Sequence, residues 1–412
     1  MKEFVKYSDA CAKRPVLNFM KIFYDGNYGL IFSDDSFWKN QRNFTLHVLR
    51  DLGKSGLEET AINQADQMIK ALKELNGKPI EMTKILTTVV GNNIYQLAFG
   101  WTFPLEDDYI MNFRNKLSEV LDVMVHPIGL LFEIWEGFKF ADPLFDHFMK
   151  KSLKKNDEIK NDIKQEIKKH RETIDYNSKP RDYIDAFLIE QRRQNIENGV
   201  HGEWSDNQLV AAVCDLFSGG METISNSIRA FILYMINYPG IQKKIHEEID
   251  REIGREKVIT MSDKVKLPYL QSCIEELQRI FVPASLNIQH KTTGEVIIGG
   301  YKLPEGTTII PQFFSIHLDE DHFADPERFD PTRYLDKENR FVKNSKITPF
   351  SLGKRACPGE NMARMNMFLL IANLFQKFEF KEEIEGKYPE IKFISGVLKS
   401  PDVFYTRLIY RE

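Results

Sequence analysis

Apolar residues recur at intervals of three and four along most of the chain, which is the spacing of a helix with a buried face. This pattern predicts helices over 36–51, 56–75, 81–99, 108–125, 142–173, 181–193, 205–237, 239–253, 268–281 and 358–377. Strand signals are few and are clearest over 296–310, where a Gly-Gly pair and a Pro-Glu-Gly turn separate short β-rich runs. We therefore expect a mainly α fold with small β-sheets.

Composition narrows the class of protein. The 412 residues are 42% hydrophobic with a net charge of -4, so the chain can bury a large core and is not basic enough to suggest a nucleic-acid partner. No linker, repeat or low-complexity segment divides it, which favours a single domain over 1–412. No apolar run reaches the roughly 18 residues of a membrane span, and no signal peptide is recognisable. The four cysteines form no paired motif, so neither disulfides nor a zinc site is expected.

One cysteine stands in an unusual setting. Cys357 lies in Phe350-Ser351-Leu352-Gly353-Lys354-Arg355-Ala356-Cys357-Pro358-Gly359, just before a long apolar helix. Glycines allow backbone to approach a flat ligand closely, and amides at the start of a helix favour a thiolate. Arg355 can meet a negative group on the same ligand. A lone cysteine is more often a buried structural residue, but this spacing favours a metal ligand.

This loop resembles the haem-binding loop of the cytochromes P-450, and the resemblance runs along the whole chain, closest to the microsomal branch. It implies haem b, with Cys357 as the axial iron ligand and with Phe350, Arg355 and Gly359 around it. A thiolate ligand favours cleavage of bound dioxygen. Met1 falls near the family's second helix, so we expect a P-450 fold that lacks the N-terminal anchor, the first helix and the first strands. The hairpin at 296–310 should then keep one edge unpaired.

A second signature interrupts the predicted helix 205–237. Its adjacent glycines, Gly219 and Gly220, each cost about 1 kcal/mol relative to alanine, and a neighbouring threonine can bond back to a carbonyl and open a groove. By itself this could be a simple kink with a surface glutamate. The resemblance implies that Gly220 lies against the haem, that dioxygen binds in the groove, and that Glu222 and Thr223 deliver protons.

Further residues resemble the family's contacts to the haem propionates. Trp38 and Arg42 lie four apart, and so share a helix face. Out of context they would be a packed aromatic residue beside a surface cation. His290, Arg355 and Arg14 match other propionate contacts, although a lone histidine is often structural.

Glu276 and Arg279, at i and i+3, resemble part of a buried charge network of the family. Arg328, in Pro326-Glu327-Arg328-Phe329, is predicted to complete it. The expected role is structural, holding the chain below the cysteine loop.

Substrate and partners follow only from the resemblance. The family's substrate contacts would come from 14–33, 108–140, 215–219, 282–288 and 395–398, whose apolar composition implies a lipophilic small molecule. The stretch 128–135 predicts either peripheral membrane contact or ordinary core packing. Lysines at 39, 343, 346 and 354 would meet an acidic NADPH-dependent reductase or cytochrome b5, unless they are scattered surface charges.

These features predict a haem-thiolate monooxygenase that inserts one atom of dioxygen into a lipophilic molecule, with electrons from NADPH through a reductase. Two alternatives stay open: a haem-thiolate isomerase or dehydratase, and a truncated, non-catalytic haem-binding protein. The resemblance places the protein on the cytosolic face of the endoplasmic reticulum membrane, or in the cytoplasm if no anchor precedes Met1.

Overall fold

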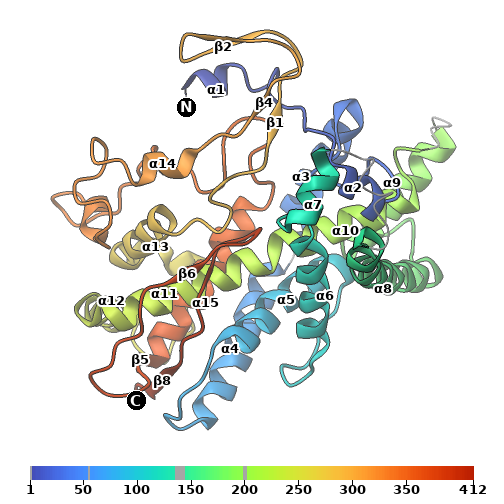
Figure 1. Ribbon diagram of the computed structural model, residues 1–412. Helices are drawn as coiled ribbons and strands as arrows, with labels where there is room; N and C mark the ends of the chain where they lie inside the picture. Colours follow the sequence, from blue (N-terminus) through green and yellow to red (C-terminus); the bar gives the residue numbers. More distant parts are fainter. Residues whose placement is uncertain (1, 54–55, 135–143, 198–201) are drawn as a thin grey trace.

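The structure is a computed structural model that describes residues 2–53, 56–134, 144–197 and 202–412, and it is predominantly helical (Figure 1). Every helix predicted from the apolar spacing is present, one of them in two parts. These helices are α3 (Asp35–Gly53), α4 (Leu57–Glu74), α5 (Thr83–Phe99), α6 (Tyr109–Asp122), α8 (Leu144–Thr173), α9 (Tyr183–Glu197), α10 (Asp206–Gly220), α11 (Glu222–Asn237), α12 (Pro239–Glu252), α13 (Pro268–Ile280) and α15 (Glu360–Lys377).

The helical segments that the spacing did not predict are short. Elements of one or two turns are held by packing and leave little periodicity to detect. They are α1 (Lys2–Lys6), α2 (Asn18–Phe23), α7 (Pro127–Ile134), α14 (Phe313–His317) and the 3₁₀ turns η2 (Met261–Lys266) and η3 (Pro331–Tyr334).

The predicted hairpin is present. Antiparallel pairing joins β1 (His290–Lys291) to β4 (Thr308–Ile309) and β2 (Val296–Ile298) to β3 (Tyr301–Leu303). Lys13 bridges the other side of β1, where the Lys291 amide donates to its carbonyl at 2.7 Å. Within the described ranges β3 and β4 have no second strand beside them.

Two further antiparallel pairs were not predicted. They join β5 (Phe378–Glu382) to β8 (Thr406–Tyr410) and β6 (Phe393–Ile394) to β7 (Ser400–Pro401). All four strands come from the last part of the chain; β5 contacts α11 and α15, β7 contacts α11, and β8 contacts α4.

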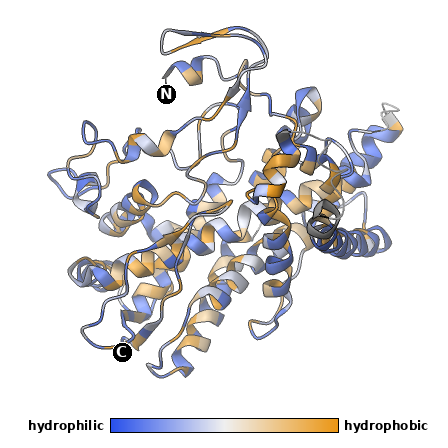
Figure 2. Cartoon of the chain, in the orientation of Figure 1, coloured by the Kyte–Doolittle hydropathy of each residue, from blue (hydrophilic) through white to orange (hydrophobic). Residues whose placement is uncertain are grey.

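The core forms around α11 and α15, which cross in the middle of the molecule and contact α4, α12 and α13 (Figure 1). A second apolar cluster joins α5, α6, α8, α9 and α10. Figure 2 shows that α8 is hydrophilic over most of its visible surface, whereas α7 is hydrophobic. Across the described residues, no helix combines the length and apolar character needed to cross a bilayer.

Candidate active site

The cysteine loop is a compact turn that ends at α15. The Cys357 amide donates to the Phe350 carbonyl at 2.8 Å, and the Ala356 amide donates to the Gly353 carbonyl at 3.1 Å. Gly353 has a φ of +79°, and a Cβ there would lie 2.8 Å from Ser8, so this position requires glycine. Helix α15 begins at Glu360 with Gly359 as its N-cap, two residues later than the start predicted at Pro358.

Cys357 differs from the other three cysteines, which are buried. Cys357 is accessible to solvent, although many protein atoms surround its sulfur. Burial raises the pKa of the Cys357 thiol; the Gly359 amide, which donates to the sulfur, and the charge of Arg42 lower it, whereas Glu360 raises it. The helix-start amide thus favours the thiolate as predicted, but the net pKa is raised, so metal binding must displace a proton.

The structure brings the five predicted propionate contacts together next to this loop. Arg355 lies over the Trp38 ring, 3.5 Å from its centroid, and Arg42 lies 5.8 Å from the same centroid. Arg42 also donates to the Ala356 carbonyl. Arg14 donates to the carbonyls of residues 288 and 289, directly before His290.

Three buried hydrogen-bonding atoms of this cluster have no partner among the described residues: Trp38 Nε1, His290 Nε2 and Arg355 Nη1. Buried polar atoms are rarely left in this state, so each marks a place for a ligand or water. The other nitrogen of His290 lies 2.7 Å from the Cys11 carbonyl and must donate to it, which leaves Nε2 unprotonated in the neutral ring. Burial lowers the pKa of His290 to about 4, with the charges of Arg14 and Arg355 adding to the shift.

Positive charge exceeds negative charge in this cluster. Asp34 is the carboxylate paired with Arg355, at 2.9 Å, and it also accepts the Arg14 amide at 3.0 Å. Burial lowers the pKa of Arg355 to about 9 and that of Arg14 to about 10. Since Arg42 is a third cation, the cluster lacks anions and is suited to bind them. Sequence reasoning missed Asp34, because nothing in its neighbours indicates that it is buried.

The predicted helix interruption lies between α10 and α11. Thr223 donates its hydroxyl to the Gly219 carbonyl at 2.7 Å, as the sequence predicted. A Cβ on Gly220 would lie 2.5 Å from Ile94 Cδ1 of α5, whereas a Cβ on Gly219 would meet nothing within 4 Å. Gly220 therefore permits close helix packing, and Gly219 is the glycine that faces open space. Glu222 forms an ion pair with Arg114 of α6, which the sequence did not predict.

The buried charge network contains a different arginine from the one predicted. Glu276 binds Arg279 through two contacts of 2.8 Å, and Arg333 Nε lies 3.4 Å from the same carboxylate. Arg328 contributes only its carbonyl, which accepts from Arg279 at 3.2 Å. The prediction of Arg328 was wrong because Pro331-Thr332-Arg333 repeats the Pro-x-Arg pattern, and η3 turns the second arginine inward.

Asp215 of α10 was expected among the substrate contacts, but its carboxylate accepts hydrogen bonds from the segment after α2. It accepts from the Tyr24 hydroxyl at 2.5 Å and from the amides of Leu30 and Ile31 at 2.5 and 3.0 Å. Burial raises the pKa of Asp215 to about 6, although these hydrogen bonds lower it. The side chain thus fixes the loop after α2 on α10.

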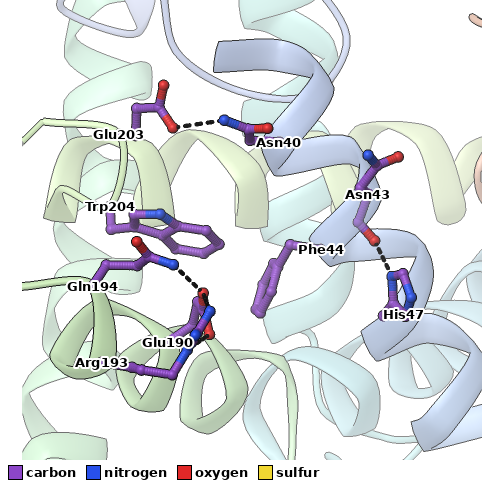
Figure 3. A pocket seen from close by; sticks show the side chains of 9 residues that line it. All are labelled: Asn40, Asn43, Phe44, His47, Glu190, Arg193, Gln194, Glu203 and Trp204. Atoms are coloured by element: carbon purple, nitrogen blue, oxygen red, sulfur yellow. Dashed lines mark hydrogen bonds and ion pairs between the residues drawn. The ribbon is translucent and has the colours of Figure 1, made fainter. Parts of the chain in front are cut away.

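A surface hollow of about 470 Å³ between α3, α9 and the segment before α10 lies apart from this site (Figure 3). Its polar side chains bind one another: Asn40 donates to Glu203 at 3.0 Å, and Gln194 donates to Glu190 at 2.7 Å. Figure 3 shows Phe44 and Trp204 between these pairs. Nothing in the hollow resembles the unpaired donors beside Cys357.

His170, Asp182 and Asp185 lie close enough together to hold a metal ion, but all three side chains already have partners within the protein. His170 binds Asp182 at 2.9 Å and the Glu166 carbonyl at 2.7 Å, and Arg181 binds Asp185 at 2.5 and 2.9 Å. These contacts make an internal ion-pair network, since Arg181 already supplies the positive charge that a metal would bring.

Comparison with known proteins agrees with the geometry. The model of the cytochrome P450 family matches residues 1–406. The chain is 36% identical over 410 residues to a probable cytochrome P450, CYP36A1, of Caenorhabditis elegans, covering 98% of this chain and 83% of the relative. It is 35% identical to cytochrome P450 2C23 of Rattus norvegicus, covering 93% and 77%, and 34% identical to cytochrome P450 2J5 of Mus musculus, covering 91% and 74%. The chain therefore belongs to the cytochrome P450 family of haem-thiolate monooxygenases.

Proposed function

We propose that Cys357 is the thiolate ligand of a haem b iron in this protein. The observation that carries the proposal is the set of three buried, unpaired atoms beside the single accessible cysteine. Phe350 supports the ligand by accepting the Cys357 amide, and Gly359 by donating to its sulfur. When bound, the haem supplies dioxygen binding and one-electron chemistry, with a strongly donating thiolate on the iron.

The residues fit this cofactor because a haem presents two carboxylates. Trp38 and Arg355 can donate to them from their unpaired nitrogens, and Arg42 and Arg14 add positive charge. A carboxylate next to His290 would raise the pKa of its imidazole again, so that Nε2 also becomes a donor. Anion binding would thus satisfy all three atoms at once.

Glu222 and Thr223 are proposed to supply protons to the reacting oxygen. Insertion of one oxygen atom into R–H consumes dioxygen, two electrons and two protons, and yields R–OH and water. The same electrons and protons yield hydrogen peroxide if the O–O bond is not cleaved. Thr223 lies beside the open space at Gly219 and can hold water there, whereas Gly220 keeps α5 close. An isomerase or dehydratase has little use for this pair, which supports the monooxygenase over that alternative.

The substrate is proposed to be a lipophilic small molecule, such as a xenobiotic, a fatty acid or a steroid-like compound. The support is the apolar composition of the segments named above. The exposed Val125, Leu130 and Leu131 next to and on α7 support peripheral contact with a membrane, and hence a place on the cytosolic face of the endoplasmic reticulum. Trp135, at the end of this stretch, lies outside the described residues.

Electrons are proposed to come from NADPH through a flavoprotein reductase, or from cytochrome b5. Lys39, Lys343, Lys346 and Lys354 are all exposed and offer positive charge to an acidic partner, although Lys354 lies 3.5 Å from Asp9.

The test is to measure haem content, NADPH consumption with added reductase, and product formation from a panel of lipophilic compounds. The proposal expects one haem per chain and product that depends on NADPH. Full haem occupancy with no oxidation of any compound would contradict it and favour a non-catalytic haem protein.

A further inference from the structure

One face of α11 carries polar side chains through an otherwise apolar interior. Glu222, Asn226 and Arg229 are spaced at i, i+4 and i+7 and so lie in a row along the helix. Their exposed fractions are 15% for the Glu222 side chain, 4% for Asn226 and 5% for Arg229. The other buried positions of the helix are mostly apolar, and the buried Ser225 and Ser227 donate their hydroxyls to helix carbonyls at 3.0 and 2.7 Å. Buried polar groups are costly unless they are hydrogen-bonded, so this row needs an explanation.

Arg229 is poorly satisfied by the protein. Its closest contact is Glu81 at 3.3 Å, and its contacts to Asn226 Oδ1 and to the Asp402 carbonyl are both 3.5 Å. Its Nε is buried without a partner in the described chain. A buried guanidinium with long contacts and an unpaired donor is the environment in which ordered water is found. The row of polar groups therefore has the chemistry of a hydrated passage.

The two ends of this passage lie where a proton path would need them. At one end Glu222 adjoins Thr223 at the break between α10 and α11, with Arg114 of α6 as its ion-pair partner. At the other end Glu81, just before α5, has a side chain that is 24% exposed. The two carboxylates and the two arginines balance in charge, so the passage as a whole does not repel a hydrated proton.

We propose that the face of α11 formed by Glu222, Asn226 and Arg229 is a water-filled path by which protons from solvent near Glu81 replenish Glu222. The proposal rests on the monooxygenase function proposed above. Arg229 and Asn226 are positioning residues that hold water, and Glu222 is the group that passes protons on. Each productive turnover draws two protons along this path, and both end in the product water, because the hydrogen of the new hydroxyl group comes from the substrate R–H.

The test replaces the path with apolar side chains in two separate variants, Arg229→Met and Asn226→Leu. Arg411→Met is the matched control, since the Arg411 side chain is 10% exposed, close to the 6% of Arg229, but pairs with Asp250 of α12 at 2.7 Å. The holoenzyme is assayed with reductase, NADPH and 7-ethoxycoumarin or lauric acid as probe. We expect the rate of NADPH-driven product formation to fall about fivefold in both path variants, with a larger solvent isotope effect, because every outcome that consumes dioxygen and two electrons also needs two protons.

Two further measurements separate a proton path from a structural role. Turnover driven by added hydrogen peroxide, which already carries both protons and both electrons, should stay within about twofold of the unmodified protein. The melting temperature of Arg229→Met should be unchanged or higher, because a poorly paired buried cation is removed, whereas that of Arg411→Met should fall. A crystal structure of the unmodified protein should show ordered water bound to Arg229 Nε.

An unchanged rate of NADPH-driven product formation in both path variants would overturn the path, and so would a crystal structure with no water at Arg229 Nε. The proposed function would survive that result if Thr223→Ala still diverts electrons to peroxide. It fails separately if the unmodified protein with bound haem oxidises no compound. If Arg229→Met does not fold, Asn226→Leu alone decides the question.

Discussion

Replacing Glu276 by glutamine tests whether the buried charge network stabilises the fold around the cysteine loop. The carboxylate accepts two bonds of 2.8 Å from Arg279, one of 2.6 Å from the Tyr334 hydroxyl and one of 2.8 Å from the Asp330 amide. Both side chains of the Glu276–Arg279 pair are fully buried. Since removing one partner of a buried pair costs about 3–5 kcal/mol, we expect Glu276→Gln to lose about 4 kcal/mol of unfolding free energy.

That loss can be converted into a melting temperature. With an unfolding entropy of about 2.1 cal/mol/K per residue, the 412 residues give about 0.9 kcal/mol/K, so the midpoint should fall by about 5 °C. The adjacent Glu275→Gln is the control. Glu275 is equally buried, but its contact with Arg364 is 3.5 Å, and burial raises its pKa, so its charge contributes less. We expect Glu275→Gln to lose about 1 kcal/mol of unfolding free energy.

The same variant should lose haem. Arg279 donates to the His317 carbonyl at 2.8 Å, and the ring of His317 accepts the Thr348 amide at 2.9 Å, two residues before the cysteine loop. Scanning calorimetry and haem content of both variants test this chain of contacts. A Glu276→Gln midpoint within about 1 °C of the unmodified protein, or an equal loss in Glu275→Gln, would refute the reasoning.

Three further predictions concern proton delivery, pH and the corrected arginine. Thr223→Ala should keep its haem but lose about tenfold in product per NADPH, with peroxide formed instead, and a normal product yield would rule out its role. Burial lowers the pKa of His170, but Asp182, the Glu166 carbonyl and Asp185 together outweigh burial, so the net pKa is raised. The charged His170 therefore stabilises the fold at low pH, and this contribution is lost as pH rises through the raised pKa. Unfolding measured from about pH 6 to 9 should show this decline, and His170→Gln should lack it. Arg333→Ala should cost about 2 kcal/mol and Arg328→Ala less than about 0.5 kcal/mol in denaturant titrations, and the reverse order would restore the original assignment.

The parts of the fold and the site that could be predicted from the sequence are those determined by the local spacing of residues. The long helices repeat apolar residues with their own period, and Trp38 and Arg42 lie on one helix, so their proximity follows from geometry. The bond from Thr223 to Gly219 likewise joins residues four apart. Each of these relationships is set within one turn of helix.

The features that the sequence could not predict depend on distant segments. Whether Arg328 or Arg333 turns inward depends on η3, since both follow the same Pro-x-Arg pattern. Gly220 packs against Ile94, more than a hundred residues earlier, and β5 pairs with β8 across a long connection. The polar row on α11 was not predicted either, because the burial of Asn226 and Arg229 depends on the elements that pack against the helix.

The central claim, that the Cys357 sulfur binds haem iron as a thiolate, is tested most directly by a carbon monoxide difference spectrum of the reduced holoprotein. We expect a strongly red-shifted Soret band that is absent from Cys357→Ala at matched protein concentration. A fully haem-loaded, correctly folded protein without that band, or a Cys357→Ala variant that keeps it, would contradict the account.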